Sequence, residues 1–268
     1  MKNFKSIDSQ IKYLKESKNI NFDNISNSRK ILLDNNYYNI ISCSKIKFVN
    51  GIRNGKHLYN KSNFRDWFDY YLKDIEVSNY LMKPLLDFER ILNSRVSYYI
   101  GKIIEEDKYI DSNFKNDLSE IIYKADIKNL PKYNRHETWK YITKMEFGKM
   151  KKLIFFLDEN KENNLLNNYL EKILLNLDLD KSKIKNQLNE LNNLRNNLFH
   201  FTPLNIYICY GISGKKNNKK LTNTKRKKAI NFILKKCPNK KIELIKEEFY
   251  KNSNKFIKIK NSQNKNSD

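Results

Sequence analysis

The chain has 268 residues, of which 39% are hydrophobic, 6 are Gly and 4 are Pro. It can therefore build a real core, and it favours long helices over a sheet with many turns. Its formal charge of +23 is extreme for this size. Such an excess predicts a polyanionic partner, usually nucleic acid, and the alternative is a basic surface that only keeps the protein soluble.

Cysteine usage and hydropathy exclude several classes of protein. Cys43, Cys209 and Cys237 are far apart and odd in number, which argues against a zinc site and against a disulfide framework. The first residues show no signal peptide, and no run reaches the roughly 18 apolar residues of a membrane span. We expect a cytoplasmic protein without metal, cofactor or membrane contact.

Residues 1–63 are predicted to form an N-terminal helical extension. Ser6 can cap a first helix, because apolar residues follow at helical spacing. A second helix is expected from about Ser28, with Leu32 and Leu33 facing inward, and the following segment to residue 48 reads as a short helix. The scattered Asn and Gly of residues 50–63 predict a loop.

Residues 64–207 show sustained helical patterning. One helix is expected from Phe64 to Ile75, and another from roughly Lys83 to Glu106, with Pro84 in its first turn or at a kink. The latter carries two polar residues on a mostly apolar helix, Glu89 and Arg95. These either form salt bridges or steer Arg195. Further helices are expected near residues 112–122, 136–145, 150–157 and 165–175.

The last part of the chain, residues 208–268, is predicted to be a basic appendage whose end is disordered. Residues 204–212 have β-branched and aromatic side chains and predict a short strand or an extended segment. Residues 215–268 hold 18 Lys or Arg against 4 Asp or Glu, so +14 of the net charge lies there. Two short basic helices are expected at residues 224–236 and 240–250. The residues expected to contact RNA phosphates are Lys215, Lys216, Lys219, Lys220, Lys225, Arg226, Lys227 and Lys228.

One stretch has an obvious chemical use, the segment Leu188–Pro203, which holds the motif Arg195-Asn196-x-x-x-His200. Its leucines step by three and four and predict a helix that ends at or just before Thr202, because Pro203 follows. Asn196 and His200 project together, away from the leucines. The structural alternative is an ordinary helix end with a capping His, a paired Arg and a solvated Asn.

These three residue types suit cleavage of RNA by its own 2′-hydroxyl. His200 can take or give a proton near neutral pH, and Arg195 can hold the phosphate and the charge that grows on it. Asn196 can orient either group. This chemistry needs no metal.

Four stretches in order resemble the Abi-like proteins of bacterial phage defence, the AbiD and AbiF group. They are QIKYLKESKNI with LLDNNYYNI, the segment NFRDWFDYYLKDIEVSNYLMKPLLDFERILNSRVSYYI, HETWKYITKMEFGKM, and LRNNLFHFTPLNIY. Together they span roughly residues 7–207. Many relatives carry Cys-Ala before the histidine, whereas this chain has Leu198-Phe199, which puts a bulky side chain beside the motif.

The resemblance implies an all-α, HEPN-like helical bundle that forms a homodimer with two motifs in one composite ribonuclease site. It implies that Arg195 and His200 are the catalytic pair, with Asn196 as their polar neighbour. It also implies a role in abortive infection and, for the AbiF branch, association with a small noncoding RNA.

The expected function is therefore metal-independent endoribonuclease activity in phage defence, with 2′,3′-cyclic phosphate products. One alternative is a non-catalytic module that holds a structured noncoding RNA. Another is a helical protein–protein module that senses a phage component, although the charge of +23 speaks against it.

Overall fold

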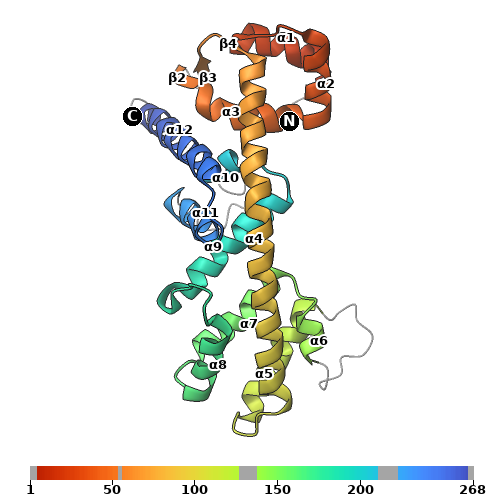
Figure 1. The fold of residues 1–268 in the computed structure, drawn as a ribbon, viewed down its shortest axis with the longest axis vertical. Coiled ribbons are helices and arrows are strands. Elements are labelled where there is room, and N and C mark those ends of the chain that lie inside the picture. The colour runs from red at the N-terminus through yellow and green to blue at the C-terminus, as the bar shows by residue number, and fades with distance from the viewer. Residues whose placement is uncertain (1–4, 54–55, 127–137, 211–222, 265–268) are drawn as a thin grey trace. The chain divides into compact units, whose positions relative to one another are not determined.

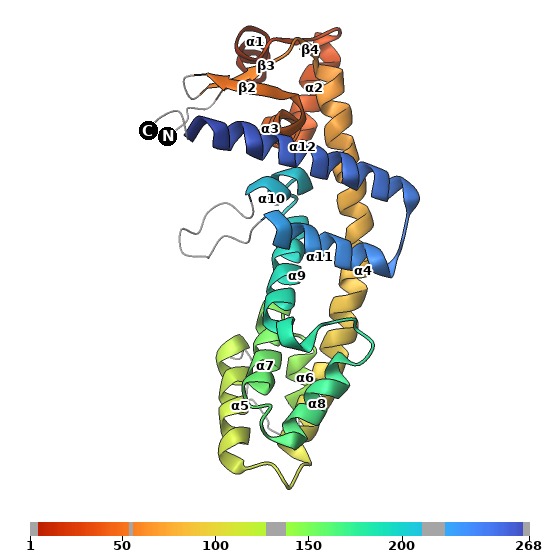
Figure 2. The same cartoon turned by 90° about the vertical axis from the view of Figure 1, so that its left-hand side faces the viewer.

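The computed structural model describes residues 5–53, 56–126, 138–210 and 223–264. The chain divides into two compact units. We call Met1–Met82 with Asn193–Asp268 the terminal unit, and Lys83–Asn192 the middle unit. As predicted, the fold is all-α, since helices dominate both units (Figures 1 and 2). The boundaries predicted at residues 63 and 207 do not coincide with this division.

The described helices have the following bounds. In the terminal unit they are α1 (Ile7–Lys18), α2 (Ile25–Asn35), α3 (Tyr37–Phe48), α10 (Leu204–Tyr210), α11 (Asn223–Lys236) and α12 (Lys240–Asn264). In the middle unit they are α5 (Ser112–Asp126), α6 (Thr138–Ile142), α7 (Phe147–Glu159), α8 (Asn164–Leu174) and a 3₁₀ turn at Lys181–Lys183. Two helices, α4 (Phe64–Glu105) and α9 (Ile184–Phe199), have residues in both units.

The described strands form two short pairs in the terminal unit. β1 (Ile20–Asn21) lies parallel to β4 (Ser62–Asn63), and β2 (Val49–Arg53) lies antiparallel to β3 (Lys56–Tyr59). Ile52 faces His57 across the second pair. The prediction of a loop at residues 50–63 is therefore wrong for most of these residues.

The N-terminal helices largely follow the sequence signals. The Ser6 hydroxyl accepts a hydrogen bond from the Ser9 amide at 3.3 Å, so the predicted cap of α1 is confirmed. α2 begins three residues before the predicted start, where Asn24 caps it. Leu32 is buried as expected, but Leu33 is 71% exposed, because it lies about 100° further around the helix axis and outside the buried face.

Aromatic packing joins α3, α4 and α12 in the core of the terminal unit. Trp67 is fully buried, stacks on Phe48 with ring centroids 4.9 Å apart, and donates from Nε1 to the Ser62 hydroxyl at 2.9 Å. One turn further along α4, the Tyr70 ring meets Phe249 of α12 at 5.4 Å. The first and last parts of the chain thus share one core.

Two predictions for the segment after Pro203 are wrong. Residues 204–210 form the helix α10 and not a strand, and α10 packs against α3, α11 and α12. α12 continues to Asn264, well beyond the short helix expected at residues 240–250, and it also packs against α3 and β2 (Figure 2). Residues 260–264 of the predicted disordered end are thus helical. Residues 208–210 and 223–264 belong to the terminal unit.

In the middle unit, α4 passes through Pro84 without ending, so the two helices predicted there are one. The Asp111 carboxylate accepts from the Asn113 and Phe114 amides at 3.0 and 3.2 Å, which confirms the predicted start of α5. The helices expected at 136–145 and 150–157 are α6 and α7, but the interruption lies at residues 143–146, and Phe147 and Gly148 already belong to α7.

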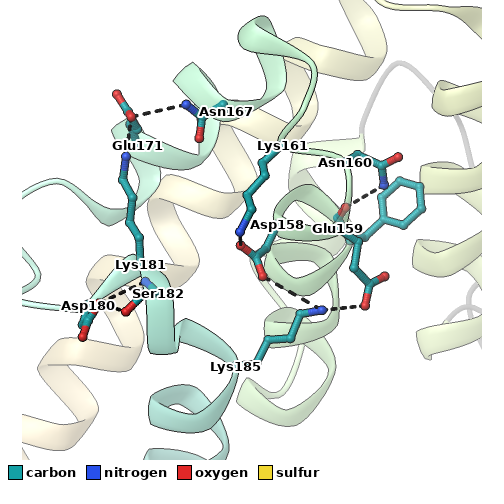
Figure 3. A network of polar contacts seen from close by, with 11 residues as sticks. Asp158, Glu159, Asn160, Lys161, Asn167, Glu171, Asp180, Lys181, Ser182 and Lys185 are labelled. Carbon is teal, nitrogen blue, oxygen red and sulfur yellow. Dashed lines mark hydrogen bonds and ion pairs between the residues drawn. The ribbon is translucent and has the colours of Figure 1, made fainter.

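Ion pairs connect the elements of the middle unit near the start of α9 (Figure 3). Lys185 contacts Glu159 of α7 at 2.8 Å, and Lys181 contacts Glu171 of α8. The Asp180 carboxylate accepts from the Ser182 amide at 2.9 Å, and its bonds with Lys183 and Ser182 lower its pKa to about 2. These residues are largely solvent-exposed, so each pair adds little stability alone.

No helix in the described ranges is both long enough and apolar enough to span a membrane.

Candidate active site at the end of helix α9

Helix α9 carries the motif, and its apolar stripe is buried as predicted. The buried residues that step along this stripe are Ile184, Leu188, Leu191, Leu194 and Leu198. Burial of that many leucines fixes the rotation of the helix about its axis, because one face is held in the core. Arg195 and Asn196 are half-buried at the edge of the stripe, and His200 is exposed.

The chain leaves α9 through a tight turn. The Thr202 amide donates to the Asn197 carbonyl at 3.2 Å, and the Phe201 amide donates to the Leu198 carbonyl at 3.1 Å. This pair of bonds is the Schellman arrangement, whose C′ residue takes left-handed backbone angles and is usually Gly. Here that residue is Phe201, with a φ of 51°, although its side chain is 80% exposed.

His200 lies one residue beyond the end of α9, so the helix ends earlier than the limit near Thr202 that Pro203 predicts. Its amide still donates to the Asn196 carbonyl at 3.0 Å, so the two residues are one turn apart. The imidazole is exposed between two aromatic residues of the chain, Phe199 and Phe201, which are 36% and 80% exposed. His200 is accessible to a ligand.

Phe199 holds the guanidinium of Arg195. The Arg195 Cζ lies 4.2 Å from the centroid of the Phe199 ring, a cation–π geometry. The Arg195 Nη1 also lies 3.5 Å from the Asn196 Oδ1, at the outer limit for a hydrogen bond. The structure therefore brings Arg195 and Asn196 together, and Phe199 contacts the arginine beside the motif.

A buried carboxylate on α4, Asp74, anchors the chain beyond the turn. Its Oδ1 accepts from the Leu204 amide at 2.7 Å, and its Oδ2 accepts from the Asn205 amide at 2.8 Å and the Asn205 side chain at 3.1 Å. The Cys43 thiol donates to the same oxygen at 3.5 Å. Asp74 thus fixes the start of α10, four residues after His200.

The environment of Asp74 sets its protonation. Burial raises the pKa of this carboxyl to about 6, although the hydrogen bonds from Asn205, Leu204 and Cys43 favour the charged form. Burial also raises the pKa of the Cys43 thiol well above its usual value, with the Asp74 charge as the second cause. Cys43 is therefore a buried, neutral thiol.

Sequence reasoning missed Asp74 and Asn197, and both left a signal. Asn197 is buried, and its side-chain amide donates to the Thr202 carbonyl at 2.9 Å across the turn. Each residue is polar at a position where helical spacing calls for an apolar one, three after Leu194 for Asn197 and three after Tyr71 for Asp74. A buried polar residue in an apolar stripe needs a partner, and here the partner is backbone.

The predicted RNA-contacting residues differ in whether the structure describes them and in how exposed they are. Lys215, Lys216, Lys219 and Lys220 lie outside the described residues. Lys225, Arg226, Lys227 and Lys228 lie on α11, and Lys228 is exposed. The Lys227 ammonium donates to the Asn254 side chain at 2.9 Å and lies 4.6 Å from the centre of the Tyr250 ring.

The prediction that Arg226 contacts an RNA phosphate is wrong. It is only 5% exposed, and its guanidinium donates to the carbonyls of Ile208 and Cys209 at 2.9 and 3.2 Å. These carbonyls belong to the last turn of α10, which leaves carbonyls without helical partners. Arg226 therefore caps a helix inside the terminal unit and is not available to a phosphate.

The two supporting residues belong to the middle unit. Arg95 donates from Nη1 to the Ile173 carbonyl at 3.3 Å and to the Leu175 carbonyl, so it caps the end of α8. This contact favours the structural alternative for Arg95. Glu89 is half-buried on the same helix. Steering of Arg195 by either residue stays a prediction.

One comparison with known proteins gives a match over most of the chain. The family model described as Abi-like protein matches residues 30–204, a segment that includes the motif. No curated protein and no solved structure matches the chain. Since the matched segment covers more than half of the 268 residues, the chain belongs to the Abi-like protein family.

Proposed function

We propose that this chain is a metal-independent endoribonuclease that acts in phage defence in the cytoplasm. Membership of the Abi-like family indicates abortive infection as the setting. The observation that carries the enzymatic part is the exposed His200 one turn from Asn196, with Arg195 held beside Asn196. This proximity supports pairing His200 as the proton-transfer group with Arg195 as the phosphate-binding group.

In the proposed reaction the ribose 2′-oxygen attacks the adjacent phosphorus, and the bond from phosphorus to the 5′-oxygen breaks. One imidazole takes the proton of the 2′-hydroxyl, and another gives a proton to the leaving 5′-oxygen. Arg195 neutralises the charge that builds on the phosphoryl oxygens. The products are a 2′,3′-cyclic phosphate and a 5′-hydroxyl.

This scheme needs two histidines, whereas one motif supplies only His200. A homodimer of the HEPN type, with two motifs facing one cleft, would complete the site. The exposed position of His200 supports this arrangement, because nothing among the described residues of one chain buries it. Phe199 and Phe201 would offer aromatic surface to the bases on either side of the scissile phosphate, since every base has a face that can stack.

The test is cleavage of a labelled single-stranded RNA in EDTA by the wild type, His200→Ala and Arg195→Ala. The control is Lys12→Ala, which removes an exposed cation of α1. We expect the control to cut like the wild type. Both motif variants should lose at least a hundredfold in rate, the range for loss of a proton-transfer group at His200 and of transition-state charge stabilisation at Arg195. Undiminished cutting by the motif variants would contradict the proposal.

The second candidate is a module that binds a small noncoding RNA without cutting it. The contact between Arg195 and Phe199 favours it, because a guanidinium stacked on a ring is partly occupied in this state. Tight, salt-sensitive RNA binding by a protein that never cuts RNA would select this candidate.

A further inference from the structure

The two halves of helix α12 differ in charge. The first half holds Glu243, Glu247 and Glu248, and these carboxylates meet lysines. Glu248, for example, contacts Lys47 of α3 at 2.8 Å and Lys73 of α4 at 2.9 Å. After Glu248 the sequence contains no Asp or Glu before residue 268, but it contains four lysines up to residue 260. The acids of α12 therefore neutralise its first half only.

A groove runs along the second half of α12. It has a volume of about 480 Å³, and the residues that line it are Asn50, Lys251, Asn254, Lys255, Lys258 and Ile259. We call it the α12 groove. Its three lysines follow the i, i+4, i+7 spacing of one helical face, and all three are exposed. Asn50 comes from β2, so two elements of the terminal unit form the walls.

The lysines of the α12 groove are available to a ligand. No carboxylate of the described residues forms an ion pair with Lys251, Lys255 or Lys258, in contrast with Lys241 and Lys246 of the first half. Three uncompensated ammonium groups on one face raise the local potential and favour an anion.

The helix that presents them is held firmly from behind. Phe256 and Ser253 are buried, and the Phe256 ring lies 5.7 Å from the Tyr210 ring of α10. The Ser253 hydroxyl accepts from the Asn223 side chain at 2.9 Å. The spacing of the lysines is therefore fixed by a packed helix and not by a loop.

The positive potential extends past the end of the groove. The ammonium groups of Lys45 and Lys260 lie 5.3 and 5.2 Å from the Tyr210 ring, on elements that pack against each other. Burial first, and then the charges of Lys45, Lys18 and Lys260, lower the pKa of His57 on β3. The charges of these lysines thus add to the effect of burial on His57.

We infer that the α12 groove binds the phosphodiester backbone of RNA. This binding surface is separate from the site at His200. The ligand class rests on the proposed function, which makes RNA the partner. Lys251 and Lys255 are about 6 Å apart along the helix axis, comparable with the spacing of successive phosphates on a strand. Asn50 and Asn254 can hydrogen-bond phosphate or ribose oxygens.

The composition of the groove also predicts how RNA is bound. Its described lining includes lysines and amides but no aromatic ring. Lysine side chains contact phosphates through charge and do not distinguish one base from another. Binding at the α12 groove is therefore independent of RNA sequence. Sequence preference, where present, arises elsewhere on the chain.

The experiment measures binding of a labelled single-stranded RNA to the full-length His200→Ala chain, over a range of salt concentrations. In that background, Lys251→Gln, Lys255→Gln and Lys258→Gln are combined in one variant. The matched control combines Lys12→Gln, Lys30→Gln and Lys83→Gln, which removes the same charge from exposed sites elsewhere.

We expect the groove variant to lose about two units of slope in log K against log salt, at about 0.7 per lost phosphate contact, and about a hundredfold in affinity at 0.1 M salt. The control should stay within about threefold of the parent. Equal losses in the two triple variants would overturn the inference, because the effect would then belong to net charge alone.

A competition experiment separates RNA from an acidic protein partner. Unlabelled RNA should displace the labelled strand at far lower concentration than poly-glutamate of the same charge, and equal displacement would contradict an RNA groove. Binding is measured without His200, so loss of the groove effect and loss of RNA cleavage are independent results. A chain that never cuts RNA can still confirm the α12 groove.

Discussion

The Asp74 carboxylate on α4 accepts a hydrogen bond from the Leu204 amide at 2.7 Å, and this contact fixes the chain just after the motif. The two residues are 130 positions apart in the sequence. Because the carboxylate also accepts from the Asn205 amide, it satisfies two donors in the first turn of α10. The position of His200 depends on this anchor and on the hydrogen bonds of Asn197.

Asp74→Ala should destabilise the protein by about 3 kcal/mol, because it leaves buried amides without an acceptor. Asp74→Asn keeps one acceptor oxygen and should cost clearly less. Urea unfolding of the three proteins, followed by circular dichroism, measures the difference. An Asp74→Ala chain as stable as the wild type would show that α10 does not need this cap.

The raised pKa of Asp74, about 6 against 3.8 in its ordinary state, predicts a dependence of stability on pH. The folded state binds this proton more tightly than the unfolded state, so the free energy of unfolding falls as pH rises from about 4 to 6. Relative to Asp74→Asn, the wild type should lose about 2 kcal/mol between pH 4 and 7. A difference that stays constant, or grows with pH, would contradict the assignment.

Arg226 should matter for folding and not for RNA. Replacing it with Met leaves the Ile208 and Cys209 carbonyls without their donor, and the expected cost is about 2 kcal/mol of stability. Lys228→Met on the exposed side of α11 should cost less than about 0.5 kcal/mol. Thermal unfolding separates the two, and a fully stable Arg226→Met protein would restore Arg226 as a candidate RNA contact.

Phe201 has left-handed backbone angles that favour Gly, and its ring is largely exposed. Phe201→Gly should therefore raise stability by about 0.5–1 kcal/mol. If the ring stacks on a base, the same substitution should weaken RNA binding about tenfold or more, at about 1–3 kcal/mol per stacked base. Phe201→Tyr keeps the ring and should bind like the wild type. A more stable Phe201→Gly chain with unchanged RNA binding would remove the stacking role.

The sequence predicted α9 well because a single apolar stripe and Pro203 determine both its rotation and its limit. It predicted the caps at Ser6 and Asp111 for the same local reason, since each side chain bonds an amide two or three residues away. Spacing placed Arg195, Asn196 and His200 near the end of this helix, but it left an ordinary helix end as an alternative, and their role stays a prediction.

Long-range contacts explain what the sequence did not predict. Helix α10 is short and largely buried, so its apolar residues resemble a strand, and the carboxylate that caps it comes from the distant Asp74. The strands β2 and β3 did leave a local signal, because Asn54-Gly55 stands between them and this dipeptide is typical of tight hairpins. Asn197 and Arg226 are polar residues whose partners are backbone groups, which spacing does not reveal.

The chemistry of the RNA ends tests the central claim most directly. The wild type is incubated in EDTA with an end-labelled RNA, and the termini at each cut are identified. We expect 2′,3′-cyclic phosphate and 5′-hydroxyl ends, no cut where the 2′-oxygen carries a methyl group, and no product from His200→Ala. Cleavage that leaves 3′-hydroxyl ends, or that continues in His200→Ala, would contradict the assignment of Arg195, Asn196 and His200 as a ribonuclease site.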